Sequence, residues 1–173
     1  PVVSRIAGEY QIFFSDDNFT SNKRRVKSLL DRILSEDLKL PPWQCQCRVE
    51  AAFDDTLLDL MARAGNNQVM IGFESVSNET LKLWKKSSTL EKNIEAIQRF
   101  QNKGIAIHGM FVLGSDFDTL ETIQKTIAFA QRMNIDTAQF FALTPLPGTP
   151  LTNKLNDEGR VLTRSWHLYD AQH

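Results

Sequence analysis

The stretch QVMIGFESVS, residues 68 to 77, decides the fold and raises the first question about function. Val69 to Phe73 are almost entirely apolar, which is typical of a strand buried on both faces of a parallel sheet. Glu74 and Ser75 follow at once. A carboxylate beside a buried strand needs a partner, and Glu is a poor helix N-cap. We therefore predict that Glu74 belongs to a binding site.

Four further apolar or β-rich runs indicate strands at 11–14, 44–49, 105–113 and 138–143. Between the runs, apolar residues recur at helical spacing within 26–34, 57–64, 94–100 and 120–130. The strand starts lie near the spacing of βαβ units, which take about 30 residues each. Such units form parallel sheets with helices on the outside. The sequence therefore predicts an α/β fold.

Local signals indicate where the helices begin and end. Ser88 to Glu91 and Asp118 to Glu121 read as capping boxes at two helix starts. Gly65, Gly104 and Asn134 each follow a helical pattern and precede a strand. These are positions where a residue in the left-handed conformation commonly ends a helix.

The chain length limits the architecture. A closed eight-unit barrel takes about 250 residues, whereas this chain has 173 residues and five predicted strands. Two architectures stay open. One is a partial (β/α) barrel, which is a curved parallel sheet with helices outside; the other is an open doubly wound sheet.

Composition argues against several classes of partner. The chain has 20 Lys and Arg against 21 Asp and Glu, a net charge of -1, which does not favour nucleic acid or a membrane surface. Its longest nearly apolar segment, 104–114, is far shorter than the roughly 20 residues of a membrane span. Two cysteines this close together indicate a reducing, cytoplasmic location. Neither terminus looks natural, and we expect the chain to be a piece of a longer protein.

Hydrogen-bonding residues follow the predicted strands. In both architectures the carboxyl ends of the strands gather the ligand-binding loops. The polar segments at these ends are 15–19, Arg48 and Glu50, Glu74 and Ser75, 114–116, and 144–149. A large polar ligand across this rim would explain the pattern, although solvent-facing helix caps would favour the same residues.

Other candidate sites are weaker. Asp16, Asp17 and Asn18 could offer oxygen ligands to a cation, but adjacent residues cannot all point inward. Cys45 and Cys47 lie on one face of a strand, and two thiolates fall short of the usual four metal ligands, so buried structural cysteines are the better interpretation.

The histidines do not indicate a catalytic site. His108 lies within a predicted strand and reads as a satisfied core histidine, and His167 and His173 read as structural. No glycine-rich phosphate loop of standard spacing is present.

Four ordered motifs carry a family resemblance: FFSDDNF, IGFESVSNETLKLWKKS, GIAIHGMFVLG and LTPLPGTPL. In this order and spacing they resemble the radical S-adenosylmethionine (SAM) enzymes. The similarity is to the branch with an N-terminal cobalamin-binding domain, which includes anaerobic Mg-protoporphyrin monomethyl ester cyclases and methyltransferases. The resemblance implies a partial barrel, strands two to six, over 1–160, followed by the start of a post-barrel segment at 161–173.

The resemblance also implies cofactors and partners. Enzymes of this family cleave SAM reductively at a four-iron four-sulfur cluster, and the resulting radical drives oxidation, cyclisation or methylation of a small-molecule, possibly tetrapyrrole, substrate. An electron donor such as flavodoxin or ferredoxin and, in this branch, cobalamin are implied. The cluster ligands form a CxxxCxxC motif, which this sequence lacks. They are therefore expected upstream, Cys45 and Cys47 are not expected to bind the cluster, and the chain alone is expected to be inactive.

Site residues follow by position in the family motifs. Glu74, with Ser75, matches a strand-end position that contacts SAM, commonly at the ribose, and Lys86 matches a basic position facing the SAM carboxylate. Arg48 or Glu50 falls where a strand contacts the methionine moiety, and Asp17 lies at the rim. The segment 143–147 resembles the adenine support. Met110 takes a place where some relatives have an acidic ribose contact.

Two other functions stay open. A cluster-free relative would keep the fold as a scaffold or binding module. An ordinary aldolase-type or isomerase barrel would need a Lys or an acid/base pair at the strand ends, whereas Lys86 is predicted at a helix start.

Overall fold

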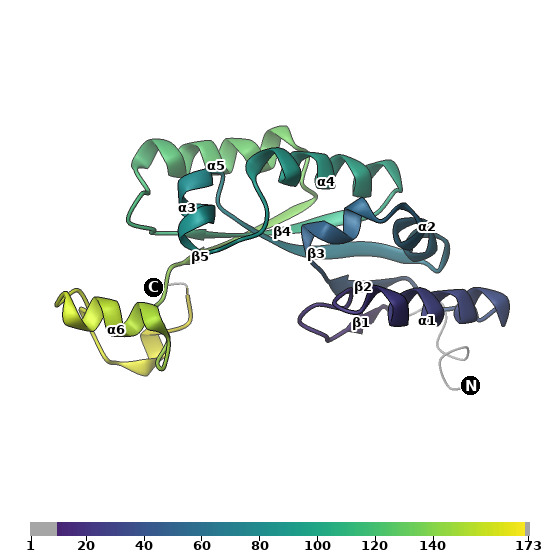
Figure 1. Cartoon of the computed structure of the whole chain (residues 1–173), viewed down its shortest axis with the longest axis horizontal. Helices are drawn as coiled ribbons and strands as arrows, with labels where there is room; N and C mark the ends of the chain where they lie inside the picture. Colours follow the sequence, from purple (N-terminus) through teal and green to yellow (C-terminus); the bar gives the residue numbers. More distant parts are fainter. Residues whose placement is uncertain (1–9, 172–173) are drawn as a thin grey trace.

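The computed structural model describes residues 10–171, which build one five-stranded parallel sheet with helices packed against it (Figure 1). The strands are β1 (Ile12–Phe14), β2 (Trp43–Gln46), β3 (Asn66–Glu74), β4 (Ala106–Leu113) and β5 (Thr137–Ala142). The helical elements are α1 (Lys23–Ser35), η2 (Val49–Phe53), α2 (Asp55–Arg63), α3 (Asn78–Leu83), α4 (Leu90–Asn102), α5 (Leu120–Arg132), α6 (Pro150–Asp157) and η3 (Trp166–Leu168).

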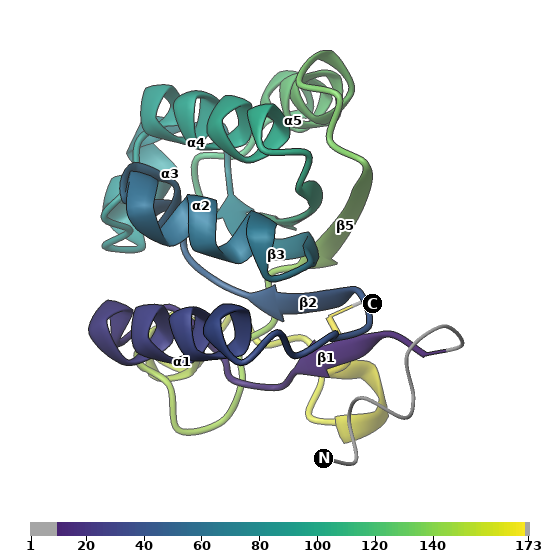
Figure 2. The ribbon, with the colours of Figure 1, turned by 90° about the vertical axis from the view of Figure 1, so that its right-hand side faces the viewer.

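The strand order decides between the two architectures. The strands pair in the order β1-β2-β3-β4-β5, and all four pairings are parallel. A doubly wound sheet would reverse direction at a switch point, so that alternative is wrong. With right-handed crossovers throughout, a sequential order puts the crossover helices on one face. Figure 2 shows α1, α2, α4 and α5 on the convex side of a curved sheet that does not close. The partial (β/α) barrel is confirmed.

The core lies between this convex face and the helices. Its fully buried side chains include Trp43, Phe73, Phe100 and Phe111. Trp43 anchors an aromatic cluster with Phe14 and Phe19, with ring centroids 5.3 and 5.6 Å from its own. The opposite, concave face is less covered. One row of paired residues across it consists of Gln46, Met70, His108 and Thr137.

The helix ends confirm some local predictions and correct others. Gly65, Gly104 and Asn134 have positive φ angles of 90°, 69° and 48°, as predicted for helix-ending positions. The two capping boxes were placed one residue too early, because the N-caps are Thr89 and Thr119.

The two residues predicted as N-caps, Ser88 and Asp118, lie just before the observed caps. Asp118 accepts hydrogen bonds from the backbone N–H groups of Gly114 and Ser115, at 2.7 and 2.9 Å, which removes it from the helix start. Ser88 is buried just before the α4 cap.

The second predicted strand also ends earlier than expected. It stops at Gln46, and Val49 begins the short helix η2. Arg48 and Glu50 therefore lie beyond the strand end, at the carboxyl rim of the sheet.

Candidate functional site

The end of β3 places Glu74 on the concave side of the rim. Pairing with β4 shifts register between Gly72 and Glu74, and Glu74 has a φ of 65°, in the left-handed region that non-glycine residues rarely adopt. Phe73 stays fully buried on the helix side. A β-bulge re-aims side chains in this way, and here it turns a carboxylate away from the core.

Gly72 makes room for this carboxylate. A Cβ atom added at Gly72 would lie 2.4 Å from Glu74 Oε1, which is far inside contact distance. The Glu74 side chain therefore folds back over the Gly72 backbone. Sequence reasoning missed Gly72, although a glycine inside a strand pattern is itself a signal of close approach.

Lys86 meets Glu74 across the rim, with Nζ 2.7 Å from Oε1. The C-terminal turn of α3 positions it: Lys85 has a φ of 53°, and the Lys86 N–H donates to the Leu81 carbonyl at 2.9 Å. This is the Schellman geometry of a helix end. Lys86 thus follows a helix, and its predicted place at a helix start was wrong. Both side chains are partly exposed, at 31% for Lys86 and 19% for Glu74, so the pair is accessible to a ligand.

Glu50, in the first turn of η2, supplies a second carboxylate. Its Oε1 accepts a short hydrogen bond from Ser87, the residue after Lys86, and its carbonyl accepts from Lys23 Nζ at 3.0 Å. Its Oε2 is buried and has no hydrogen-bond partner among the described residues. An unpaired buried carboxylate oxygen is costly, so this atom is a candidate ligand contact.

The ionisation of Glu50 is set by opposing influences. Burial acts to raise its pKa. The hydrogen bond from Ser87, the interaction with the N–H of its own backbone, and the charges of Arg48 and Lys23 act against burial, and the pKa lies below its ordinary value. Glu50 therefore stays a carboxylate at neutral pH and can accept from a cationic donor.

These side chains line one cleft of about 160 Å³, which we call the polar cleft. It brings together five of the six predicted site residues and Met110. The lining residues that bear on the argument are Asp17, Arg48, Glu50, Gly72, Glu74, Lys86, Ser87 and Met110. Ser75 is not among them, because it is buried and its hydroxyl accepts from the Ser77 N–H at the start of α3.

The two cysteines lie in β2 and directly after its end. Cys45 and Cys47 are free and buried in the core. A hydrogen bond with Cys45, together with burial, raises the pKa of the Cys47 thiol well above its ordinary value, which opposes the thiolate that metals bind. Within residues 10–171 no group of three His, Cys, Asp or Glu side chains could hold a metal ion. The residues described here do not fit an iron–sulfur cluster.

His108 is satisfied but is not a core residue. It lies on the concave face, where its Nδ1 is 2.8 Å from Thr137 Oγ1 and its Nε2 is 3.3 Å from Gln139 Oε1. The predicted core position was wrong because strand periodicity does not say which face the helices cover. His167 is exposed in η3, and His173 lies outside the described residues.

Comparison with known proteins identifies the family. Residues 5–130 match the sequence model of the radical SAM superfamily. The chain belongs to this superfamily.

Two of its relatives are named as a methyltransferase and as a cyclase. It is 34% identical to an uncharacterised methyltransferase of Pyrococcus horikoshii over 94% of this chain and 35% of that protein. It is 29% identical to the anaerobic magnesium-protoporphyrin IX monomethyl ester cyclase of Rubrivivax gelatinosus over 85% of this chain and 26% of that protein. The chain thus spans about a third or less of these relatives.

A solved structure of the same superfamily has the same fold. The radical SAM methyltransferase TsrM of Kitasatospora setae, with cobalamin and a [4Fe-4S] cluster bound, matches 86% of this chain and 30% of its own, with a TM-score of 0.77 and 21% identity. No helix in the described part of this radical SAM chain is long and apolar enough to cross a membrane.

Proposed function

We propose that the polar cleft binds the charged, methionine end of SAM and its ribose, in a protein that cleaves SAM reductively to drive oxidation, cyclisation or methylation of an organic substrate. The observation that carries the proposal is the buried, unpartnered Oε2 of Glu50 beside the Lys86–Glu74 ion pair. SAM presents an ammonium and a carboxylate on one carbon, and the cleft offers an acceptor and a cation on adjacent loops.

Each side chain has a chemical task in this proposal. Glu50 accepts hydrogen bonds from the SAM ammonium, which gives its buried Oε2 atom the hydrogen-bond donor that it lacks within the protein. Lys86 attracts the SAM carboxylate as a point charge. Glu74 shares its second oxygen with the ribose hydroxyls while its first holds Lys86 in place.

The segment 143–147, which resembles the adenine support, does not line the polar cleft; Leu143, Thr144 and Pro145 line a second cavity instead. The cluster would supply the electron for SAM cleavage, and its ligands are proposed to lie in a cysteine loop outside this sequence. Cobalamin is proposed for the complete protein by analogy with the branch it resembles.

Replacing Glu74 by Gln or Lys86 by Met should weaken SAM binding while leaving the fold intact. Loss of one charge-assisted hydrogen bond costs about 1.5–3 kcal/mol, which corresponds to an affinity about 10- to 100-fold lower. Isothermal titration calorimetry of the complete protein with SAM measures the change, and circular dichroism checks the fold. If both variants bind SAM as tightly as the unsubstituted protein does, this ion pair has only a structural role.

Replacing Cys45 and Cys47 together by Ser should leave the iron content of the complete, anaerobically reconstituted protein unchanged. Both thiols are buried, Cys47 against the polar cleft, and they do not form the CxxxCxxC motif of the family's cluster ligands. The expected product is a brown protein whose iron and sulfide equal those of the parent. Loss of iron in the double variant would show that these thiols bind the cluster after all, whereas a parent that binds no iron would favour the cluster-free scaffold.

A further inference from the structure

The short helix α3 carries the loop that forms one wall of the polar cleft. Lys86 and Ser87 follow its C-terminal end. Lys86 pairs with Glu74, and the Ser87 hydroxyl donates to Glu50. α3 has six residues, and isolated helices shorter than about 12–15 residues are marginal in water. Its place at the rim is therefore set by contacts with the rest of the protein.

Two residues of α3, Thr80 and Leu81, are buried in the protein. The Leu81 side chain is fully buried, and the Leu81 carbonyl accepts the Lys86 N–H at 2.9 Å. Thr80 is also fully buried, and its Oγ1 lies 3.0 Å from Ser115 Oγ in the loop after β4. Because Ser115 is buried as well, water competes little for this hydrogen bond. The two hydroxyl groups thus join α3 to the neighbouring loop.

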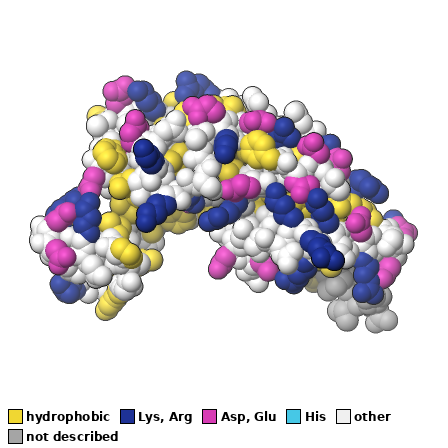
Figure 3. All heavy atoms as spheres, viewed as in Figure 1, with side chains coloured by type: hydrophobic (Ala, Val, Ile, Leu, Met, Phe, Trp, Pro, Cys, Tyr) yellow, Lys and Arg dark blue, Asp and Glu magenta, His cyan; other side chains and the backbone are white. Residues whose placement is uncertain are grey.

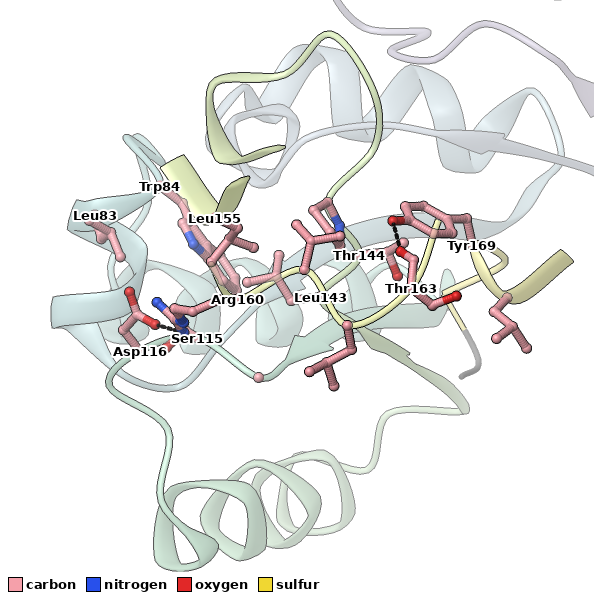
Figure 4. Close-up of a pocket in the computed structure, with 15 residues that line it drawn as sticks. Leu83, Trp84, Ser115, Asp116, Leu143, Thr144, Leu155, Arg160, Thr163 and Tyr169 are labelled. Atoms are coloured by element: carbon pink, nitrogen blue, oxygen red, sulfur yellow. Dashed lines mark hydrogen bonds and ion pairs between the residues drawn. The ribbon is translucent and has the colours of Figure 1, made fainter. Parts of the chain in front are cut away.

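The loop after β4 has contacts of its own that hold it in place. One oxygen of Asp118 accepts from the N–H groups of Gly114 and Ser115, at 2.7 and 2.9 Å. Asp116 in the same loop accepts from Arg160 at 2.6 Å, the ion pair drawn in Figure 4. Figure 3 shows hydrophobic side chains gathered where the part of the chain after β5 joins the rest of the molecule, at the left of the view. The loop is therefore held without the help of α3 and can serve as its anchor.

We propose that Thr80 is a positioning residue for Lys86, because its hydrogen bond with Ser115 fixes α3 and therefore the loop that follows it. The assignment of its effect to SAM binding rests on the proposed function. Lys86 reaches Glu74 on a long side chain, so a shift of the loop backbone changes where its charge lies. A hydroxyl pair with only a structural role would stabilise the fold without affecting the position of this charge.

Thr80→Val removes the hydroxyl group and keeps the size of the side chain. In the complete protein it should raise the dissociation constant for SAM about 3- to 10-fold, the usual effect of one lost neutral hydrogen bond. Hydrogen–deuterium exchange of residues 77–89, measured by mass spectrometry, should become faster by a similar factor, because exchange reports local opening. Thr80→Ser keeps the hydroxyl group and should restore both values.

Thr126→Val is the matched control for this variant. Thr126 is also a buried helical threonine, and its hydroxyl donates to the Thr122 carbonyl at 2.9 Å within α5. The variant loses a buried hydrogen bond of the same kind, so its melting temperature should fall to a similar extent. Because Thr126 does not contact α3 or the polar cleft, SAM affinity and the exchange of residues 77–89 should stay unchanged.

A double-mutant cycle tests whether Thr80 acts through Lys86. If it does, Thr80→Val should cause no further loss of SAM affinity once Lys86 is replaced by Met. Additive losses overturn the proposal, and so does unchanged exchange of residues 77–89 in Thr80→Val. Normal SAM affinity in Thr80→Val also overturns it, provided that Lys86→Met lowers the affinity. If Lys86→Met has no effect on SAM affinity, the proposed function of Lys86 fails, while faster exchange in Thr80→Val still supports the positioning of its loop.

Discussion

Replacing Gly72 by Ala should reduce SAM affinity about 10- to 100-fold, the loss expected when a charge-assisted contact is misplaced. The new Cβ would lie 2.4 Å from Glu74 Oε1. That oxygen is at the end of a flexible side chain, so the carboxylate moves and the backbone stays. The ion pair with Lys86 is displaced, while the free energy of unfolding should change by less than about 1 kcal/mol.

A neighbouring glycine provides the matched control for this variant. Gly109 lies in β4, where an added Cβ would meet Ile135 Cγ2 at 3.1 Å on the helix side of the sheet. Gly109→Ala should therefore cost about 1–3 kcal/mol of stability through overpacking and leave SAM affinity unchanged. Calorimetric titration and urea unfolding of both variants give the two quantities. Normal SAM binding by Gly72→Ala would disprove the placement of Glu74 in the site.

Replacing Trp43 by Ala should destabilise the fold by about 3–5 kcal/mol. Trp43 is fully buried, packs edge-on against Phe14, and donates its indole N–H to the Ala64 carbonyl at 2.7 Å. The variant loses this contact surface and leaves a buried carbonyl without its donor. Because whole domains are stable by only about 5–15 kcal/mol, this one change removes a large fraction of the total.

Trp166→Ala is the control for the size of the residue removed. Trp166 is 66% exposed and packs against Tyr169. Surface substitutions usually stay within about 0.5 kcal/mol. Urea unfolding followed by circular dichroism compares the two variants, and a loss below about 1 kcal/mol in Trp43→Ala would show that the aromatic cluster does not hold β1 and β2 to the core.

Periodicity predicted the five strands and the helices α1, α2, α4 and α5 because apolar spacing reflects which face each element buries, but it gave no helix at α3 or α6. It could not predict strand order, which depends on pairings between distant segments. The sequential order excluded the doubly wound sheet only once those pairings were seen. His108 was misplaced for the same reason, since the covered face of a strand is decided by helices elsewhere in the chain.

The candidate site shows a similar division. Polar residues after the strands pointed to the rim, and the family resemblance singled out Lys86. Neither could predict the bulge at Glu74, which arises from the register between β3 and β4, nor the hydrogen bond from Ser87 to Glu50. The hydrogen bond between Thr80 and Ser115 was also beyond sequence reasoning, because the two residues lie 35 positions apart in different parts of the fold.

The left-handed backbone at Glu74 sets stability against binding. That conformation costs a non-glycine residue about 1–2 kcal/mol, and Gly or Asn would adopt it with less strain. Selection of variants for heat resistance alone should therefore favour Gly or Asn at position 74 and discard the carboxylate. Thermostable versions of this protein should keep Glu74 only when binding is selected at the same time. A screen for melting temperature should select Gly or Asn at position 74, whereas a screen for activity should select Glu.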